Sequence, residues 1–349
     1  MRIVFTGKSD YTYNRNAILL KGLKKLKGVQ VLEMPIVSRK TFNKKRFSET
    51  AAMADFVYIP PFRHRDVRFI KSLTDTPVVF DPLISEYMTK VVDYGQKWKS
   101  WFKLLKDRRS FNACDLLIAE TEANKRLYRD IIGIDEKKIK CLYIGVDRDE
   151  FFPRDLPPKD HYFNIGFYGS FIPLQGIPKI IETAHLLRDE EEIRFHLIGS
   201  GYLFEVIKKR VESLHLNNVV FPGWLHHSDL PGAISQFDLC LGIFGDSLKA
   251  DSVIPNKIFH YAGMKKCILT KRTPAIEEVF SDGKDIVLTN STADEIAHQI
   301  RYLKSNPEKR NAIAEAGYLN ISEHFNEVKI AEIFLKILAD HGSHFSIKS

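Results

Sequence analysis

The sequence predicts an α/β protein made of two doubly wound domains, each a parallel sheet with helices on both faces. Short apolar runs alternate with segments of helical periodicity along most of the chain, which is typical of such sheets. At 349 residues the chain is longer than one hydrophobic core normally supports. A segment rich in proline, 145–160, interrupts the alternation and indicates a boundary between two domains.

The first half contains six apolar runs that we expect to form strands. The first run, RIVFTG (2–7), precedes leucines at helical spacing in NAILLKGLKKL (16–26). The other five runs are VQVLEMP, DFVYIPP, PVVFDP, CDLLIAET and IKCLYIGV. Strands that alternate with helices pair in parallel, so residues 1–155 are predicted to form the N-terminal domain.

The second half repeats this organisation from NIGFYGS, which is followed by a helix to Leu187. Five further strands are expected in IRFHLIGSG, NVVFPGWL, FDLCLGIF, CILTKR and DIVLTN, with later helices near 294–304, 307–321 and 327–339. The C-terminal domain is predicted over 156–325, and a final helix over 326–349 could pack back on the N-terminal domain. Since ligands of doubly wound sheets bind outside the carboxyl ends of the strands, a cleft between the two domains is the expected site.

The composition is typical of a globular protein, with 44% hydrophobic and 28% charged residues. No run reaches the roughly 20 apolar residues of a membrane span. The N-terminus is interpreted as a strand rather than a signal peptide, and the four cysteines include no Cys-x-x-Cys. We therefore expect a cytoplasmic protein, which could be peripheral on the inner face of the membrane.

The positive charge is concentrated in the first half, where residues 1–160 hold 32 Lys and Arg against 21 Asp and Glu. Two segments carry much of it, RKTFNKKR (39–46) and KWKSWFKLLKDRR (97–109). The second mixes Trp98 and Trp101 with lysines, which suits a helix lying on an anionic bilayer surface. A solvated helix whose aromatic residues pack on the domain is an equally good interpretation. No nucleic-acid partner is expected, because no binding motif accompanies the charge.

Two segments of the second half each place a loop before a helix. They are NIGFYGSFIPLQGIPKIIETAHLL and VIPNKIFHYAGMKKCILT. The start of a helix has free N–H groups and a positive dipole end, and Lys257 adds a full positive charge to the second one. Two such helix starts at one cleft would bind a diphosphate, although each feature also has an ordinary explanation as a solvated lysine or a turn glycine.

These segments resemble the GT-B glycosyltransferases, specifically the family-4 type of retaining enzymes. The resemblance covers most of the chain and is strongest over about 164–325, where GFYGSFIPLQGI, HLIGSG, VVFPGW, LPGAISQFDLCLGIF, IPNKIFHYAGMKKCILT and PAIEEVFSDGKDIVL occur in the family's order. In the first half, CDLLIAETEANKRLYRDI and IGVDRDEFFP are similar to the family's strand, helix and interdomain linker. The resemblance implies two Rossmann-like domains facing a central cleft. It also implies a nucleotide-sugar donor, a glycan, glycolipid or protein acceptor, a role such as polysaccharide biosynthesis, and no metal or other cofactor.

The resemblance also implies a set of site residues. The catalytic candidates are Asp81, which would orient the acceptor or stabilise positive charge on the sugar, and Lys257, which would stabilise the departing diphosphate. With retention, the leaving phosphate itself could accept the proton of the acceptor hydroxyl. The expected donor-binding residues are Gly7, Gly169, Ser170, Gln175, Gly199, Asn256, Lys257, His260 and Glu277.

The sequence departs from the family pattern at several of these positions. Ser170 and Gln175 stand where many relatives carry Arg and Lys, and Ser252 and His260 where many carry a pair of glutamates. Asp81 aligns with a histidine common in the first domain. These departures motivate one alternative to a transferase, a catalytically degenerate binding subunit. A second alternative is a GT-B-like sugar-nucleotide epimerase, which would act without an acceptor.

Overall fold

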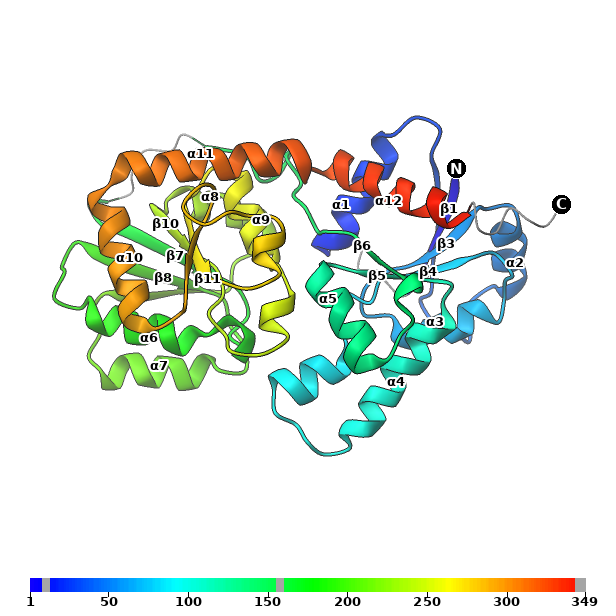
Figure 1. Cartoon of the computed structure of the whole chain (residues 1–349), viewed down its shortest axis with the longest axis horizontal. Coiled ribbons are helices and arrows are strands. Elements are labelled where there is room, and N and C mark those ends of the chain that lie inside the picture. Colours follow the sequence, from blue (N-terminus) through cyan, green and yellow to red (C-terminus); the bar gives the residue numbers. More distant parts are fainter. Residues whose placement is uncertain (8–12, 155–159, 343–349) are drawn as a thin grey trace. The chain divides into compact units, whose positions relative to one another are not determined.

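The computed structural model describes residues 1–7, 13–154 and 160–342 of the chain. The chain forms two compact units (Figure 1). Unit 1 comprises Met1–Gly145 and Phe325–Ser349, and unit 2 comprises Val146–His324.

The two units divide at Gly145, the first residue of the proline-rich segment that suggested the domain boundary. The predicted boundary at 155/156 lies outside the described residues. The earlier division has a physical reason in Phe151, which is 1% exposed and stacks on the ring of His260 in unit 2, with 3.6 Å between ring centroids. The segment after Gly145 is therefore part of the core of unit 2.

Unit 1 contains a six-stranded sheet in the order β2-β1-β3-β4-β5-β6, with every adjacent pair parallel. The strands are β1 Arg2–Gly7, β2 Gln30–Pro35, β3 Phe56–Ile59, β4 Val78–Phe80, β5 Leu116–Ala119 and β6 Ile139–Cys141. All residues of β3, β4 and β5 are buried, as expected for continuous apolar runs covered by helices on both faces.

The helices of unit 1 are α1 Asn14–Lys25, α2 Lys44–Ala52, α3 His64–Lys71, α4 Ser100–Ala113, α5 Glu122–Leu127 and α12 Glu327–Gly342, with π-helical turns at Met88–Asp93 and Tyr128–Ile132. Helix α12 packs on α1, although the two are separated by the whole of unit 2 in the sequence. A Cβ atom on Gly22 of α1 would collide with the backbone of Glu327, so the glycine allows the close approach. An ion pair of 2.8 Å joins Lys25 to Glu327.

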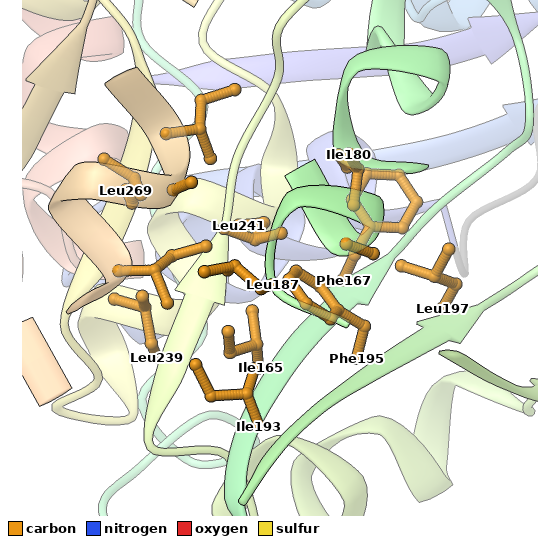
Figure 2. Close-up of a cluster of buried hydrophobic side chains, with 14 of the residues drawn as sticks. Ile165, Phe167, Ile180, Leu187, Ile193, Phe195, Leu197, Leu239, Leu241 and Leu269 are labelled. Atoms are coloured by element: carbon orange, nitrogen blue, oxygen red, sulfur yellow. The ribbon is translucent and has the colours of Figure 1, made fainter. Parts of the chain in front are cut away.

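Unit 2 contains a second parallel sheet in the order β12-β11-β10-β7-β8-β9. Its strands are β7 Phe163–Tyr168, β8 Ile193–Ile198, β9 Val219–Gly223, β10 Leu239–Leu241, β11 Ile268–Lys271 and β12 Val287–Thr289. Its helices are α6 Ile177–Leu186, α7 Phe204–Ser213, α8 Leu230–Ser235, α9 Asn256–Gly263, α10 Ala293–Ser305 and α11 Pro307–His324. Alternate residues of β7 and β8, such as Ile165 and Phe195, point into the apolar core shown in Figure 2.

The two sheets confirm the predicted α/β class with two doubly wound domains. Each sheet has a switch point, where the chain leaves a first strand in one direction and later returns to its other side. In unit 1 this point lies between β1 and β3, and in unit 2 between β7 and β10. Ligands of such sheets bind at the carboxyl ends of the strands at this point. Among the described helices, none has both the length and the apolar composition that crossing a bilayer requires.

Candidate functional site

The switch point of unit 2 holds a buried lysine. Lys257 is the second residue of α9 and is 3% exposed. Its Nζ donates a hydrogen bond of 2.6 Å to Oε1 of Gln175, which lies in the turn after β7. The same Nζ lies 3.5 Å from the ring centroid of Phe167. Two of the predicted donor-binding residues, 82 positions apart in the sequence, are thus in direct contact.

The charge of Lys257 has no ionic partner among the residues that the structure describes. Burial lowers the pKa of its ammonium group well below the ordinary value, and no neighbouring carboxylate opposes this effect. The Gln175 amide is neutral, and the face of an aromatic ring supplies only a partial negative charge. An anion placed next to Nζ would therefore be strongly favoured over the empty site.

Glycines bring the backbone close to this ammonium group. Gly169, directly after β7, has φ +151°, and a Cβ atom there would stand 3.0 Å from Nζ of Lys257. Gly199, directly after β8, has φ +134°, and a Cβ atom there would collide with the carbonyl oxygen of Gly169. Both positions require glycine, because the two turns and the lysine meet without space for a side chain.

The start of α6 lies at the same edge of the sheet. Among its first three residues, Pro178 has no N–H and the Lys179 N–H donates to the Gly176 carbonyl, so the N–H of Ile177 is the one that a ligand could accept from. Gly176 precedes this helix with φ +66°, and no side chain caps the helix N-terminus. A Cβ atom on Gly176 would collide with the backbone of Phe244, so the turn before α6 lies against the turn after β10. The first N–H groups of a helix point away from it with a positive partial charge, as an anion-binding site requires.

Asn256 and His260 lie on α9 beside Lys257. The Asn256 Oδ1 atom and the His260 Nε2 atom are buried, and neither has a hydrogen-bond partner among the described residues. His260 Nδ1 lies 2.6 Å from the Tyr168 hydroxyl. Burial, with a smaller contribution from His227, lowers the pKa of His260 well below its ordinary value, so its ring is neutral at physiological pH. A contact between this neutral ring and a nucleotide stays a prediction.

Two other predicted donor-binding residues do not touch this group. Glu277 is exposed, in the short 3₁₀-helix Ile276–Glu278, and accepts a hydrogen bond of 2.8 Å from Arg272. Ser170 is exposed, and its carbonyl accepts a hydrogen bond from the backbone N–H of Ile172. The roles of both residues toward the donor stay predictions.

The two site residues predicted in the first half lie near the switch point of unit 1. Gly7 ends β1 with φ +117°. Asp81 follows β4 and is 0% exposed. Its Oδ2 accepts hydrogen bonds from Arg15 Nε at 2.7 Å and from the Tyr58 hydroxyl at 2.9 Å. In this arrangement the Asp81 carboxylate is enclosed by its partners, and its predicted role toward the acceptor is untested.

A cluster of charges around the turn after β10 was missed by sequence reasoning. Asp246 pairs with Lys179, in the first turns of α6, at 2.6 Å and with Lys271, at the end of β11, at 3.3 Å. Lys271 also pairs with Asp251 at 3.0 Å. The positions of the two lysines could have indicated this cluster. Lys179 follows a glycine turn and Lys271 ends a strand, so both are expected at the carboxyl edge of the sheet. Among the described residues, no group of three His, Cys, Asp or Glu side chains could hold a metal ion.

Comparisons with known proteins support the fold described above. A family described as glycosyl transferase-like matches residues 179–336, which include Lys257 and His260. The solved structure of Anabaena HepE in complex with UDP-glucose is 17% identical, with a TM-score of 0.74 over 97% of this chain and 100% of that one. Sucrose-phosphate synthase from Thermosynechococcus elongatus is 12% identical, with a TM-score of 0.74 over 99% of this chain and 100% of that one. The chain has the GT-B fold of these structures.

One curated relative matches the chain over part of its length. It is the chitobiosyldiphosphodolichol beta-mannosyltransferase of Debaryomyces hansenii, 26% identical over 170 residues. The match spans 48% of this chain and 32% of the relative, so the chain aligns with about a third of that protein. For this chain the comparisons therefore confirm the predicted fold, and residues 179–336 match a family described as glycosyl transferase-like. Its assignment to the retaining family-4 type stays a prediction.

Proposed function

We propose that the chain transfers a sugar from a nucleoside-diphosphate sugar to a glycan, lipid-linked or protein acceptor, and that its diphosphate binds beside Lys257. The observation that carries this proposal is the buried Lys257 ammonium group, whose partners are the neutral Gln175 and the ring of Phe167. A diphosphate would provide the missing negative charge. The complexes of HepE with UDP and with UDP-glucose support a donor of this class.

The proposed chemistry places positive groups where negative charge develops. When the bond between the sugar and the diphosphate breaks, charge accumulates on the leaving phosphate oxygens. Lys257 and the positive dipole end at the start of α6, with the N–H of Ile177, would stabilise that charge more than the charge of the ground state. We expect no cofactor besides the nucleotide sugar, and retention of the anomeric configuration, with the leaving phosphate accepting the proton of the acceptor hydroxyl.

The acceptor is proposed to be lipid-linked. The curated relative is named for chitobiosyldiphosphodolichol, a sugar on a lipid diphosphate. A lipid-linked acceptor would also agree with the exposed aromatic residues and lysines of unit 1. Incubation of the chain with a radiolabelled donor and a membrane extract, followed by separation of lipid from aqueous products, tests this class of acceptor.

Substitution of Lys257 tests the site directly. Lys257→Met should abolish the thermal stabilisation that UDP, GDP or ADP gives the wild-type chain, because a bound ligand stabilises only the state that binds it. Sugar transfer should fall by about 100- to 1000-fold in kcat, the usual cost of losing one group that stabilises transition-state charge. Differential scanning fluorimetry and a donor-turnover assay measure the two effects.

Lys266→Met is the matched control for this experiment. Lys266 lies between α9 and β11 and donates hydrogen bonds to the carbonyls of Ser235 and Phe237, so its loss should lower stability and leave the nucleotide response intact. An undiminished nucleotide response in Lys257→Met would remove this lysine from the site. A product analysis separates the alternatives, since an epimerase interconverts the donor without an acceptor and a degenerate subunit binds it without turnover.

A further inference from the structure

Three aromatic residues that are close in sequence are exposed at and just before the start of α4 in unit 1. Trp98, Trp101 and Phe102 are 77%, 59% and 49% exposed. Trp101 and Phe102 stack on each other, with ring centroids 3.6 Å apart. We call Lys97–Lys103 the aromatic tip; Figure 1 shows it in cyan, at the beginning of α4. Apolar surface of this size is costly to leave in water and commonly marks a contact with another body.

Lysines surround these rings. Lys97 and Lys99 are exposed, and Lys99 Nζ lies 5.3 Å from the centroid of the Trp98 ring. Lys103 Nζ lies 3.4 Å from the Trp98 carbonyl oxygen. No carboxylate among the described residues pairs with any of these three lysines. The aromatic tip is therefore both apolar and positively charged.

The body of α4 holds the tip in place from inside the unit. Its buried residues, Asp107, Ser110 and Phe111, belong to the second half of the helix. The Asp107 carboxylate accepts a hydrogen bond of 2.6 Å from the Ser85 hydroxyl, and Phe111 packs against Phe80. The second half of the helix is therefore packed into unit 1. Its aromatic residues gather at one end, where they can enter a surface as a point contact.

A basic pocket continues the positive surface from the tip. Its volume is about 500 Å³, and the residues lining it include Arg63, Arg65, Lys90 and Lys106. Lys106 follows Phe102 by four residues, so the two share one face of α4. Glu86 also lines the pocket and is paired with Lys106. The cations of the pocket exceed its acidic residues, so its field extends the attraction of the tip for anions.

We propose that unit 1 docks on an anionic phospholipid bilayer through the aromatic tip, with Trp98 and Trp101 in the interfacial layer and the lysines at the lipid phosphates. Tryptophan is well suited to that layer because one part of its ring is apolar and another donates a hydrogen bond. Lysines near the surface add attraction to acidic lipids. Bases of a nucleic acid need open ring faces, whereas Trp101 and Phe102 already occupy a face of each other.

The second basic segment has a different local role. Arg39 donates a hydrogen bond of 2.8 Å to Asp66 and lies over the ring of Phe69, at 5.3 Å. Asn43 caps α2 by accepting from the backbone N–H of Arg46. Part of the charge in 39–46 is therefore used within unit 1, and the proposal depends on the aromatic tip alone. It is also independent of the proposed sugar transfer, because docking needs no donor.

The experiment uses Trp98 and Trp101 as fluorescent reporters. The third tryptophan of the chain, Trp224, lies in unit 2 and is replaced. In a Trp224→Phe background, all tryptophan emission comes from the tip. Vesicles of phosphatidylcholine with about one third phosphatidylglycerol should shift this emission to the blue, and pure phosphatidylcholine should not. Lys99→Gln/Lys103→Gln should weaken co-sedimentation with the anionic vesicles about thirtyfold, because each lysine near the surface contributes about a factor of five.

Two matched controls keep the outcome decisive. Lys208→Gln/Lys209→Gln removes the same charge from exposed positions of α7 in unit 2 and should bind vesicles as the parent does. Trp98→Ser/Trp101→Ser should lose most binding, while Trp224→Ser should lose none. Equal binding to neutral and anionic vesicles, or binding without a blue shift, would overturn the proposal. Displacement from vesicles by a short RNA or an acidic polysaccharide, with no blue shift on lipid, would identify another anion as the partner.

Discussion

Each unit buries a cation at the switch point of its sheet, but the two cations are balanced differently. In unit 1, Arg15 is 1% exposed and donates to the Asp81 carboxylate at 2.7 Å and to the Tyr143 carbonyl at 2.6 Å. In unit 2, Lys257 is 3% exposed, and its hydrogen-bond acceptor is the neutral Gln175. The arginine has a full counter-charge within its own unit, and among the described residues the lysine has none.

The pKa values of the two side chains move in opposite directions for this reason. Burial alone would lower the pKa of Arg15, but Asp81, together with Tyr58 and Glu120, outweighs this effect, and the pKa is raised. Burial lowers the pKa of Lys257 with nothing to oppose it. A buried cation with its partner is a structural element, whereas a buried cation without one is kept at a cost to stability. This difference is the basis of the proposal that a diphosphate binds beside Lys257.

The largest expected effect follows from removing the balanced cation. Arg15→Met leaves the Asp81 carboxylate buried without its counter-charge and should lower the free energy of unfolding by about 3–5 kcal/mol. The double variant Arg15→Met/Asp81→Leu removes both charges and should recover most of the loss. Urea unfolding measures both. A single variant as stable as the wild type would show that the pair is not structural.

A carboxylate beside Lys257 should give this lysine the kind of balanced ion pair that Arg15 and Asp81 form in unit 1. In Gln175→Glu, the new carboxylate would pair with Lys257, raise the pKa of its ammonium group and repel a diphosphate. We expect the affinity for nucleoside diphosphates to fall about tenfold, equivalent to about 1.4 kcal/mol. Isothermal titration calorimetry measures the affinity. Tighter nucleotide binding by this variant would contradict the proposal that the charge of Lys257 binds the diphosphate.

The smallest expected effect is a gain in stability when the unbalanced cation is removed. Without ligand, Lys257→Met should raise the free energy of unfolding by on the order of 1 kcal/mol, because a desolvated charge disappears. The pKa of Lys257 is lower in the folded state than in the unfolded state. The gain in the free energy of unfolding is therefore largest at pH values below the folded-state pKa. It should fade as the pH rises toward the unfolded value of about 10.4. Urea unfolding from neutral to alkaline pH tests the trend, and a gain that grows with pH would contradict it.

The sequence was sufficient to predict the elements of the fold. Each apolar run assigned to a strand contains one, from RIVFTG in β1 to DIVLTN in β12, because buried parallel strands need continuous apolar residues. The order of the strands and the division at Gly145 could not be predicted. They depend on contacts such as Phe151 on His260, between residues more than 100 positions apart, which leave no periodic pattern.

The proximity of candidate site residues was predictable where glycine or helix-start patterns mark them and not elsewhere, and their roles stay predictions. Gly169, Gln175 and Lys257 are in reach of one another, as their loop positions suggested. The enclosure of Asp81 was not visible, because its partner Arg15 precedes it by 66 residues and both look like exposed polar residues in the sequence. Likewise, no pattern showed that Arg272 would hold Glu277.

The packing of α12 on α1 has a consequence for how the chain acquires its structure during synthesis. Unit 2 is continuous in sequence, so all of its strands are available before α12 leaves the ribosome. Unit 1 must wait, because the surface of α1 around Gly22 is covered by a helix that is translated only after the whole of unit 2. The order of maturation should therefore be the reverse of the order of translation, with the N-terminal sheet completed last.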